Sequence, residues 1–313
     1  YLHSLLQLAE GGSKEAWEDY EFRQFRIATQ KGIDVATWTG QELEGVTIVV
    51  LAEQGIGDQI LFASFLSIII ERASATYLVC SDKLVQLFRD SFPRAMVIAE
   101  SELGKLENEI TANYQVSIAS LGLYLAMFVG RFGGKRPYLF ASRALREKWR
   151  SRLDRLGSGL KIGISWRGGT TKTGQLLRSI DLTHWKPILR IAGVHFISLQ
   201  YGENHQDIGK CNDALGIKIH DFAIDERNYA DTAALTVELD LIITVSTSIV
   251  SLASALGAEV WVFTPVGAGW MYGLQSRESG WLPSARLFRQ RHLNDWNDAV
   301  VEVSEMLLRR LSA

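Results

Sequence analysis

The feature that most constrains the fold is a strand-and-helix pattern that runs through the first half of the chain and then starts again. Residues 46–52 (VTIVVLA) form an almost continuous apolar run rich in β-branched residues, which is typical of a buried strand in a parallel sheet. Residues 161–166 (KIGISW) open a second series of the same kind. We therefore predict an α/β protein with two halves, each built on a parallel sheet.

Further apolar segments predict the remaining strands and helices of both series. In the first half we expect strands at 76–80, 96–99 and 114–119, with helices at 59–70 and 82–92. In the second half we expect strands at 195–200, 217–222, 241–245 and 260–265, with helices at 183–191, 230–238 and 248–256.

Two stretches fall outside these series. Residues 1–27 carry apolar side chains at roughly helical spacing, and Gly11 with Gly12 divides them into two short helices. Residues 130–160 hold a glycine-rich basic segment followed by a charged helix, 143–156, which indicates a linker. A hinge at this linker would let the two halves close on a ligand.

Composition excludes several classes of protein. The 313 residues suit two domains, and 33 basic against 35 acidic residues argue against a nucleic-acid-binding protein. Cys80 and Cys211 are too few for a disulfide framework or a zinc site, and they suit a reducing compartment. We expect a cytoplasmic protein, because the sequence shows no apolar run of membrane-spanning length and no signal peptide.

The first candidate for chemistry is the loop that follows the strand at 46–52. Gly55 and Gly57 allow a tight turn and a close approach to a ligand, and the next helix begins with free N–H groups that favour an anion. Asp58 stands at the start of that helix. It could cap the helix or act as a general base on a hydroxyl, and the local pattern leaves both open.

Two loops in the second half are the other candidates. Arg167, Gly168 and Gly169 follow the strand at 161–166, and with Arg178 they could line a phosphate or sugar pocket. The alternative is a solvated loop. Residues 246–248 (STS) open a helix and could hold a diphosphate, or serve only as its N-cap.

The remaining patterns argue mostly against other chemistry. The histidines have no metal-ligand spacing, and neither an Asp-x-Asp motif nor a nucleophile elbow is present. Asp231 and Thr232 start a helix and could be simple caps. Trp166, Trp270 and Trp281 lie near loops and could stack on a base or sugar, although most tryptophans lie in cores. No Gly-x-Gly-x-x-Gly follows either leading strand, which disfavours an NAD-dependent enzyme.

Several of these segments together resemble a known family. They are AEQGIGDQILFA at 52–63, GISWRGG at 163–169, RSI at 178–180, SLQYG at 198–202 and YADTAAL at 229–235. In this order they resemble the bacterial glycosyltransferase domain found behind tetratricopeptide repeats. That domain is related to the ADP-heptose lipopolysaccharide heptosyltransferases. The resemblance covers nearly the whole chain, and residues 17–23 look like the end of the last repeat.

The resemblance implies the GT-B fold, in which two Rossmann-like domains face each other across a cleft. Residues 1–40 would be a helical lead-in, 41–140 the acceptor domain and 141–313 the nucleotide-sugar domain, and the final helix could pack back on the acceptor domain. The reaction would be a metal-independent, inverting sugar transfer without a cofactor, with Asp58 as the base. The expected donor-binding residues are Gly55, Gly57, Trp166, Arg167, Gly168, Gly169, Arg178, Gln200, Asp231, Thr232, Ser246, Thr247, Ser248 and Ser251.

One departure from the family pattern matters. Ser246 stands where the family usually has an aspartate, and Ser251 where a histidine is expected. Serine makes weaker hydrogen bonds to sugar hydroxyls than a carboxylate does. A different donor sugar would account for the change, and so would a weakened or inactive module that only binds nucleotide sugars. The acceptor would be a protein or a glycan.

Overall fold

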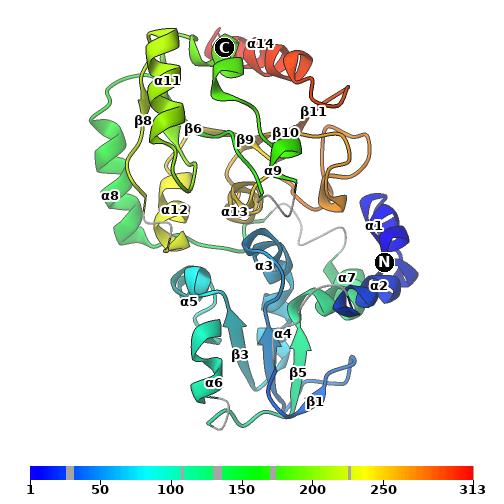
Figure 1. Ribbon diagram of the computed structural model, residues 1–313. Coiled ribbons are helices and arrows are strands. Elements are labelled where there is room, and N and C mark those ends of the chain that lie inside the picture. The colour runs from blue at the N-terminus through cyan, green and yellow to red at the C-terminus, as the bar shows by residue number, and fades with distance from the viewer. Residues whose placement is uncertain (26–31, 107–108, 130–135, 170–173, 225–226, 313) are drawn as a thin grey trace.

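The computed structural model describes residues 1–25, 32–106, 109–129, 136–169, 174–224 and 227–312 (Figure 1). It confirms the predicted fold class, because the chain forms two separate parallel sheets with helices around them. The first sheet has the order β1-β5-β2-β3-β4. Its strands are β1 (Ala36–Thr37), β2 (Thr47–Leu51), β3 (Ala75–Cys80), β4 (Met96–Ala99) and β5 (Tyr114–Ser117).

The second sheet is also parallel, with the order β11-β10-β9-β6-β7-β8. Its strands are β6 (Leu160–Ser165), β7 (Val194–Ser198), β8 (Ile219–His220), β9 (Leu241–Val245), β10 (Val260–Thr264) and β11 (Ala285–Arg289). Every residue of β9 and β10 is buried, as their continuous apolar runs predict for strands covered on both faces.

Helices connect the strands of the first sheet and cover its faces. They are α3 (Ile56–Phe62), α4 (Leu66–Arg72), α5 (Val85–Ser91), α6 (Leu103–Leu106) and α7 (Leu121–Val129). The single helix predicted over 59–70 is divided by a 3-10 turn, η2 (Ala63–Phe65). Residues 82–84 and 118–120 also form 3-10 turns, η3 and η5, so two predicted element ends are shorter than expected.

The second sheet has the larger set of helices. They are α8 (Arg143–Asp154), α9 (Gln175–Arg178), α10 (Lys186–Leu189), α11 (His205–Leu215), α12 (Tyr229–Thr236), α13 (Ser248–Leu256) and α14 (Asn297–Ser312), with 3-10 turns η7 (Leu182–Trp185) and η8 (Trp270–Tyr272). The resemblance implies that the final helix could pack back on the first half. Instead, α14 packs on α10 and β11, and its buried residues join the core of the second half.

The lead-in consists of α1 (Leu2–Ala9), α2 (Lys14–Tyr20) and a 3-10 turn, η1 (Glu21–Phe25), so the two predicted helices are present. It lies beside the gap between the two halves (Figure 1). Helix α1 packs on η8 of the second half, whereas α2 packs on α7 of the first. Trp17 makes edge contacts with Phe62 of the first half and with Trp270 and Trp281 of the second.

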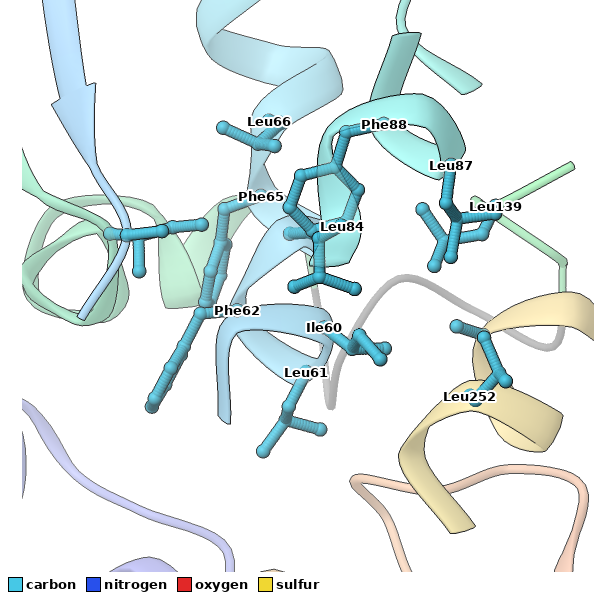
Figure 2. Close-up of a cluster of buried hydrophobic side chains, with 14 of the residues drawn as sticks. Ile60, Leu61, Phe62, Phe65, Leu66, Leu84, Leu87, Phe88, Leu139 and Leu252 are labelled. Atoms are coloured by element: carbon cyan, nitrogen blue, oxygen red, sulfur yellow. The ribbon is translucent and has the colours of Figure 1, made fainter. Parts of the chain in front are cut away.

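One apolar core continues across both halves. Figure 2 shows Ile60 and Leu61 of α3 on the side that faces Leu252 of α13, with Leu139 of the connecting segment nearby. Helices α3 and α13 pack directly on each other. In that segment, Tyr138 and Leu139 donate their backbone N–H groups to the carbonyl of Ala255.

Three further expectations concern the whole chain. Most of the glycine-rich part of the predicted linker, 130–135, lies outside the described residues. Cys80 and Cys211 are buried and free. No helix within the described ranges is long and apolar enough to cross a membrane.

Candidate functional site

A cleft of about 1030 Å³ lies between the two halves. The loops that follow β2, β7, β9 and β10 line it, so the carboxyl ends of both parallel sheets face the same space. In open α/β sheets, ligands bind at this edge. The lead-in adds Tyr1, Leu5 and Tyr20 to the wall, and η8 adds Trp270 and Tyr272.

Asp58 lines the cleft from the first half. It lies in the first turn of α3, and its carboxylate accepts a hydrogen bond of 3.2 Å from the backbone N–H of Gly55. This is the capping interaction, and it leaves the second carboxylate oxygen for other partners. Burial raises the pKa of Asp58 to about 6, against the lowering effect of the Gly55 N–H and of the positive charge on Arg178. A carboxylate with this pKa is suited to accept a proton near neutral pH.

Arg178 enters the cleft from the second half, at the end of α9. Its charge acts on both Asp58 and Tyr272, which locates it near the base candidate. Among the residues that the structure describes, its guanidinium makes no hydrogen bond and no ion pair. A half-buried cation in a cleft that no described side chain or carbonyl pairs with is suited to bind an anion.

The start of α13 brings four hydroxyl side chains to the cleft, those of Ser246, Thr247, Ser248 and Ser251. Thr247 caps the helix by accepting a hydrogen bond of 3.2 Å from the N–H of Ile249. The Ser248 hydroxyl lies 2.6 Å from that of Tyr229. Helix α13 therefore presents its N-terminus and neutral hydroxyls to the cleft, with no carboxylate at position 246 or 251.

The two glycine loops come close to this helix. A Cβ atom added to Gly57 would lie 3.4 Å from the Cα atom of Ser248. A Cβ atom added to Gly168 would lie only 2.7 Å from the carbonyl oxygen of Ser246. Gly168 is therefore needed for close packing between the ends of β6 and β9, rather than for direct contact with the cleft. Gly169, the next residue, does line the cleft, as does Gly55.

Gln200 lines the cleft, but its amide is occupied by the protein. Its Oε1 accepts hydrogen bonds from the backbone N–H groups of Trp166 and Arg167, at 3.0 and 2.8 Å. Its Nε2 donates to the carbonyl of Tyr201. Gln200 therefore fixes the shape of the loop after β6. Thr232, on α12, also borders the cleft.

Three residues that we predicted to contact the ligand have side chains that bind other groups of the protein instead. Trp166 was expected near the ligand, but its side chain is 1% exposed in the core of the second half and donates to Asp207. Arg167 pairs with Asp207 at 3.3 Å and donates to the carbonyl of Glu203. The buried carboxylate of Asp231 accepts from Trp149 and Lys148, and so joins α12 to α8.

The remaining expectations concern the loop after Gly169, two tryptophans and a metal site. Thr170 and Lys172, in the loop after Gly169, lie outside the described residues. Trp270 borders the cleft, whereas Trp281 is buried and donates its indole N–H to the carbonyl of Leu8. In the described part of the chain, no group of three or more His, Cys, Asp or Glu side chains is arranged to hold a metal ion.

Sequence reasoning missed two tyrosines of the site. Tyr20 accepts a hydrogen bond of 3.2 Å from the side chain of Gln54, in the loop that carries Asp58. Tyr272 is buried beside Ser246, and burial raises its pKa to about 12. Its hydroxyl therefore remains protonated at neutral pH. The only signal for either residue was its aromatic character near a predicted helix or loop.

The chain can be compared with known proteins by its sequence and by its fold. A scan against models of protein families finds none that matches. Protein FlbA of Caulobacter vibrioides is 28% identical over 325 residues, which cover 98% of this chain and 54% of FlbA. The chain thus spans about half the length of the curated relative that it matches.

Solved structures match over most of the chain at low identity. The glycosyl transferase family 9 protein of Veillonella parvula has a TM-score of 0.62 and 12% identity, over 87% of this chain and 97% of that one. The ADP-heptose lps heptosyltransferase II of E. coli has a TM-score of 0.58 and 14% identity, over 85% and 100%. The E. coli heptosyltransferase WaaC, solved with ADP-2-deoxy-2-fluoro heptose, has a TM-score of 0.53 and 11% identity, over 83% and 99%. These likenesses show that the chain has the GT-B fold.

Proposed function

We propose that this chain is a glycosyltransferase that moves a sugar from a nucleotide-sugar donor to an acceptor hydroxyl, with inversion and without a metal ion. One observation carries the proposal. Asp58 from the first half faces the same cleft as Arg178 and the N-terminus of α13 from the second half. In the proposed reaction Asp58 would be a base opposite a site for the diphosphate, which is the arrangement that attack on a sugar attached to a diphosphate requires. The structural neighbours include a heptosyltransferase named for an ADP-sugar.

The second half would bind the donor. Arg178 would contact the diphosphate, and the free N–H groups at the start of α13 would contribute further donors. Both also stabilise the leaving group, because the nucleoside diphosphate gains negative charge as the bond from the anomeric carbon to its oxygen breaks. Ser246, Thr247, Ser248 and Ser251 would hydrogen-bond the donor from the same end of the cleft.

Asp58 would act on the acceptor. As the acceptor oxygen forms its bond to the anomeric carbon, the proton of that hydroxyl passes to the Asp58 carboxylate. Attack from the face opposite the leaving diphosphate inverts the anomeric configuration. The acceptor, a protein or a glycan, would approach from the side of the first half and the lead-in. We assign the reaction to the cytoplasm, with which the two free cysteines are compatible.

The test is a panel of nucleotide sugars, with release of nucleoside diphosphate as the readout, in the presence and absence of EDTA. We expect release from one donor that EDTA does not change. Asp58→Asn should lower the rate by about 10²- to 10⁴-fold, the range typical of general-base removal. Release that is unaffected by Asp58→Asn would remove the proposed base.

Ser246 and Ser251 favour a second candidate, a module that binds nucleotide sugars without transferring them. They leave α13 without a carboxylate at its start. Calorimetry separates the two candidates. Micromolar affinity for a nucleotide sugar without release from any donor and acceptor pair would support the binding module.

A further inference from the structure

The lead-in is attached directly to the loop that carries Asp58. Tyr20 and Arg23 lie three residues apart, where α2 passes into η1. The Tyr20 hydroxyl accepts from Gln54 Nε2 at 3.2 Å. The Arg23 guanidinium donates through Nε and Nη2 to Glu53 Oε1, at 3.1 and 2.5 Å. Two neighbouring side chains of the lead-in thus hold the two residues that directly precede the glycine loop.

Arg23 is an unusual residue to find completely buried. Its exposed fraction is 0%, and besides Glu53 it pairs with Glu21 at 2.5 Å and donates to Ser120 at 2.8 Å. Its guanidinium also lies over the Tyr20 ring, 4.8 Å from the centroid. A buried ion pair is on average no more stabilising than apolar packing of the same volume, so its stronger justification is a fixed geometry.

The loop itself needs such support. Gln54 has a φ of 66°, a left-handed backbone conformation that is uncommon for a residue other than glycine. The conformation persists only when the surrounding structure enforces it. Tyr20 contacts the Gln54 side chain, and Gln59 Nε2 reaches the Gln54 carbonyl at 3.5 Å. Only three residues lie between Gln54 and Asp58 in the chain.

We infer that Tyr20 and Arg23 are positioning residues for Asp58: they fix the loop 53–58 so that the carboxylate faces the cleft. This inference rests on the proposed function, because it assigns the lead-in to the machinery of the proposed base. A domain boundary at residue 40 would leave Tyr20 and Arg23 outside the two transferase domains. Their contacts with Gln54 and Glu53 make them part of the site.

The first arm of the test is enzymatic. Tyr20→Phe removes only the hydroxyl, and Arg23→Lys keeps the charge but loses the planar fork. Each should lower kcat by at least about 10-fold while the KM for the donor stays within about 2-fold, because base alignment is lost and donor contacts are retained. A looser loop also admits water to Asp58 and so lowers its pKa. The acid limb of the pH profile, which is the fall of kcat as the pH is lowered, should therefore occur at a lower pH than in the wild type.

The matched control is Ser91→Ala. Ser91 is buried at the end of α5, where its hydroxyl donates to the Leu87 carbonyl at 2.7 Å and accepts from Phe140 N–H at 3.0 Å. This variant should lower thermal stability and leave the acid limb in place. If Tyr20→Phe and Arg23→Lys behave like Ser91→Ala, with stability lowered and the acid limb unmoved, the positioning role is wrong.

The second arm needs no donor and therefore separates this inference from the proposed function. Hydrogen exchange should be at least about 5-fold faster at amides 53–58 in Tyr20→Phe and Arg23→Lys, with no change at residues 47–51 of β2. Unchanged exchange at 53–58 overturns the inference even in an active enzyme. Faster exchange in a protein that turns over no donor would support the role of Tyr20 and Arg23 in fixing the loop, and would count against the proposed function alone.

Discussion

Asp58 is the residue at which the demands of folding and of the proposed chemistry conflict. Its carboxylate completes the first turn of α3 by accepting from Gly55, which favours the ionised form. Burial at the cleft opposes ionisation more strongly, and the pKa rises to about 6. The folded protein therefore holds a carboxylate that it would hold more easily as the neutral acid.

This conflict predicts a stability effect opposite in sign to the activity effect. An unfolded Asp ionises near 3.8 and folded Asp58 near about 6, so the contribution of Asp58 to stability is greatest below 3.8 and is lost as pH rises through about 6. Asp58→Asn keeps an oxygen for Gly55 and removes that loss. We expect its melting temperature to exceed the wild-type value by about 2 °C or more at about pH 8, and by less at about pH 5. An equal or lower value at the higher pH would contradict the buried-carboxylate description.

Arg178 gives a second prediction at the residue scale. Arg178→Gln should weaken binding of a nucleoside diphosphate by about 10- to 100-fold in calorimetry, because a charge-assisted hydrogen bond is lost. It should also move the acid limb of the rate profile to higher pH, since the Arg178 charge lowers the pKa of Asp58. Arg178→Lys keeps the charge, so it should leave the limb near the wild-type position. Equal affinities in all three proteins would place the diphosphate elsewhere.

At the scale of elements, the sequence identified most strands because the interior of each sheet demands continuous apolar runs. Strands β2, β9 and β10 are such runs, and their predicted positions are confirmed within about a residue. The strands that were missed are β1, which has two residues, and β11, where arginines interrupt the apolar run at positions 286 and 289. Both are edge strands, which need to bury less of their surface.

The candidate site was predicted well where backbone position decides and poorly where side-chain direction decides. The loops after β2 and β9 each lie at the carboxyl edge of their own sheet, and Asp58 and Thr247 line the one cleft that these two edges face. Trp166 and Asp231 lie at suitable points of the chain, but their side chains point into the core and toward α8. Tyr20 could not be predicted, because long-range packing alone brings it to Gln54.

Gly168 offers a test of how the strand ends fit together. The Cβ of Gly168→Ala would approach the Ser246 carbonyl to 2.7 Å, so the loop after β6 or the start of α13 must shift. We expect destabilisation of about 1–3 kcal/mol and nucleotide affinity lowered by about 10-fold. Gly209→Ala is the control, because its Cβ meets open space on α11 and should raise stability by about 0.5–1 kcal/mol. A Gly168→Ala protein as stable as the wild type would show that the ends of β6 and β9 accommodate the added methyl group.

At the scale of the whole molecule, one apolar cluster joins the two halves, and each half also has an apolar cluster of its own. Apolar residues of α3 and α13 meet across the gap (Figure 2). Trp17 contacts both halves. The contact between α3 and α13 is apolar, whereas interfaces between domains are commonly more polar. The arrangement predicts that the halves unfold together, in one calorimetric transition whose van't Hoff and calorimetric enthalpies agree.

Gly122→Ala tests this cooperativity. Its Cβ would lie 2.3 Å from the Trp17 ring, so it displaces a side chain that both halves contact. The single transition should move to lower temperature, with exchange accelerated in β2 and β9 alike. Gly104→Ala, whose Cβ meets open space on α6, should leave both strands unchanged. Faster exchange confined to β2 would mean that the halves are energetically independent.

The position of Trp17 between the halves also governs how this protein can be recombined with its relatives. A chimera that takes its second half from another chain would bring foreign partners to Trp17 at positions 270 and 281, and a foreign neighbour to the Leu8 carbonyl. Breakpoints chosen from the sheets alone would therefore create mismatched aromatic packing. Functional exchange should succeed only when residues 1–25 are matched to both of the halves that they join.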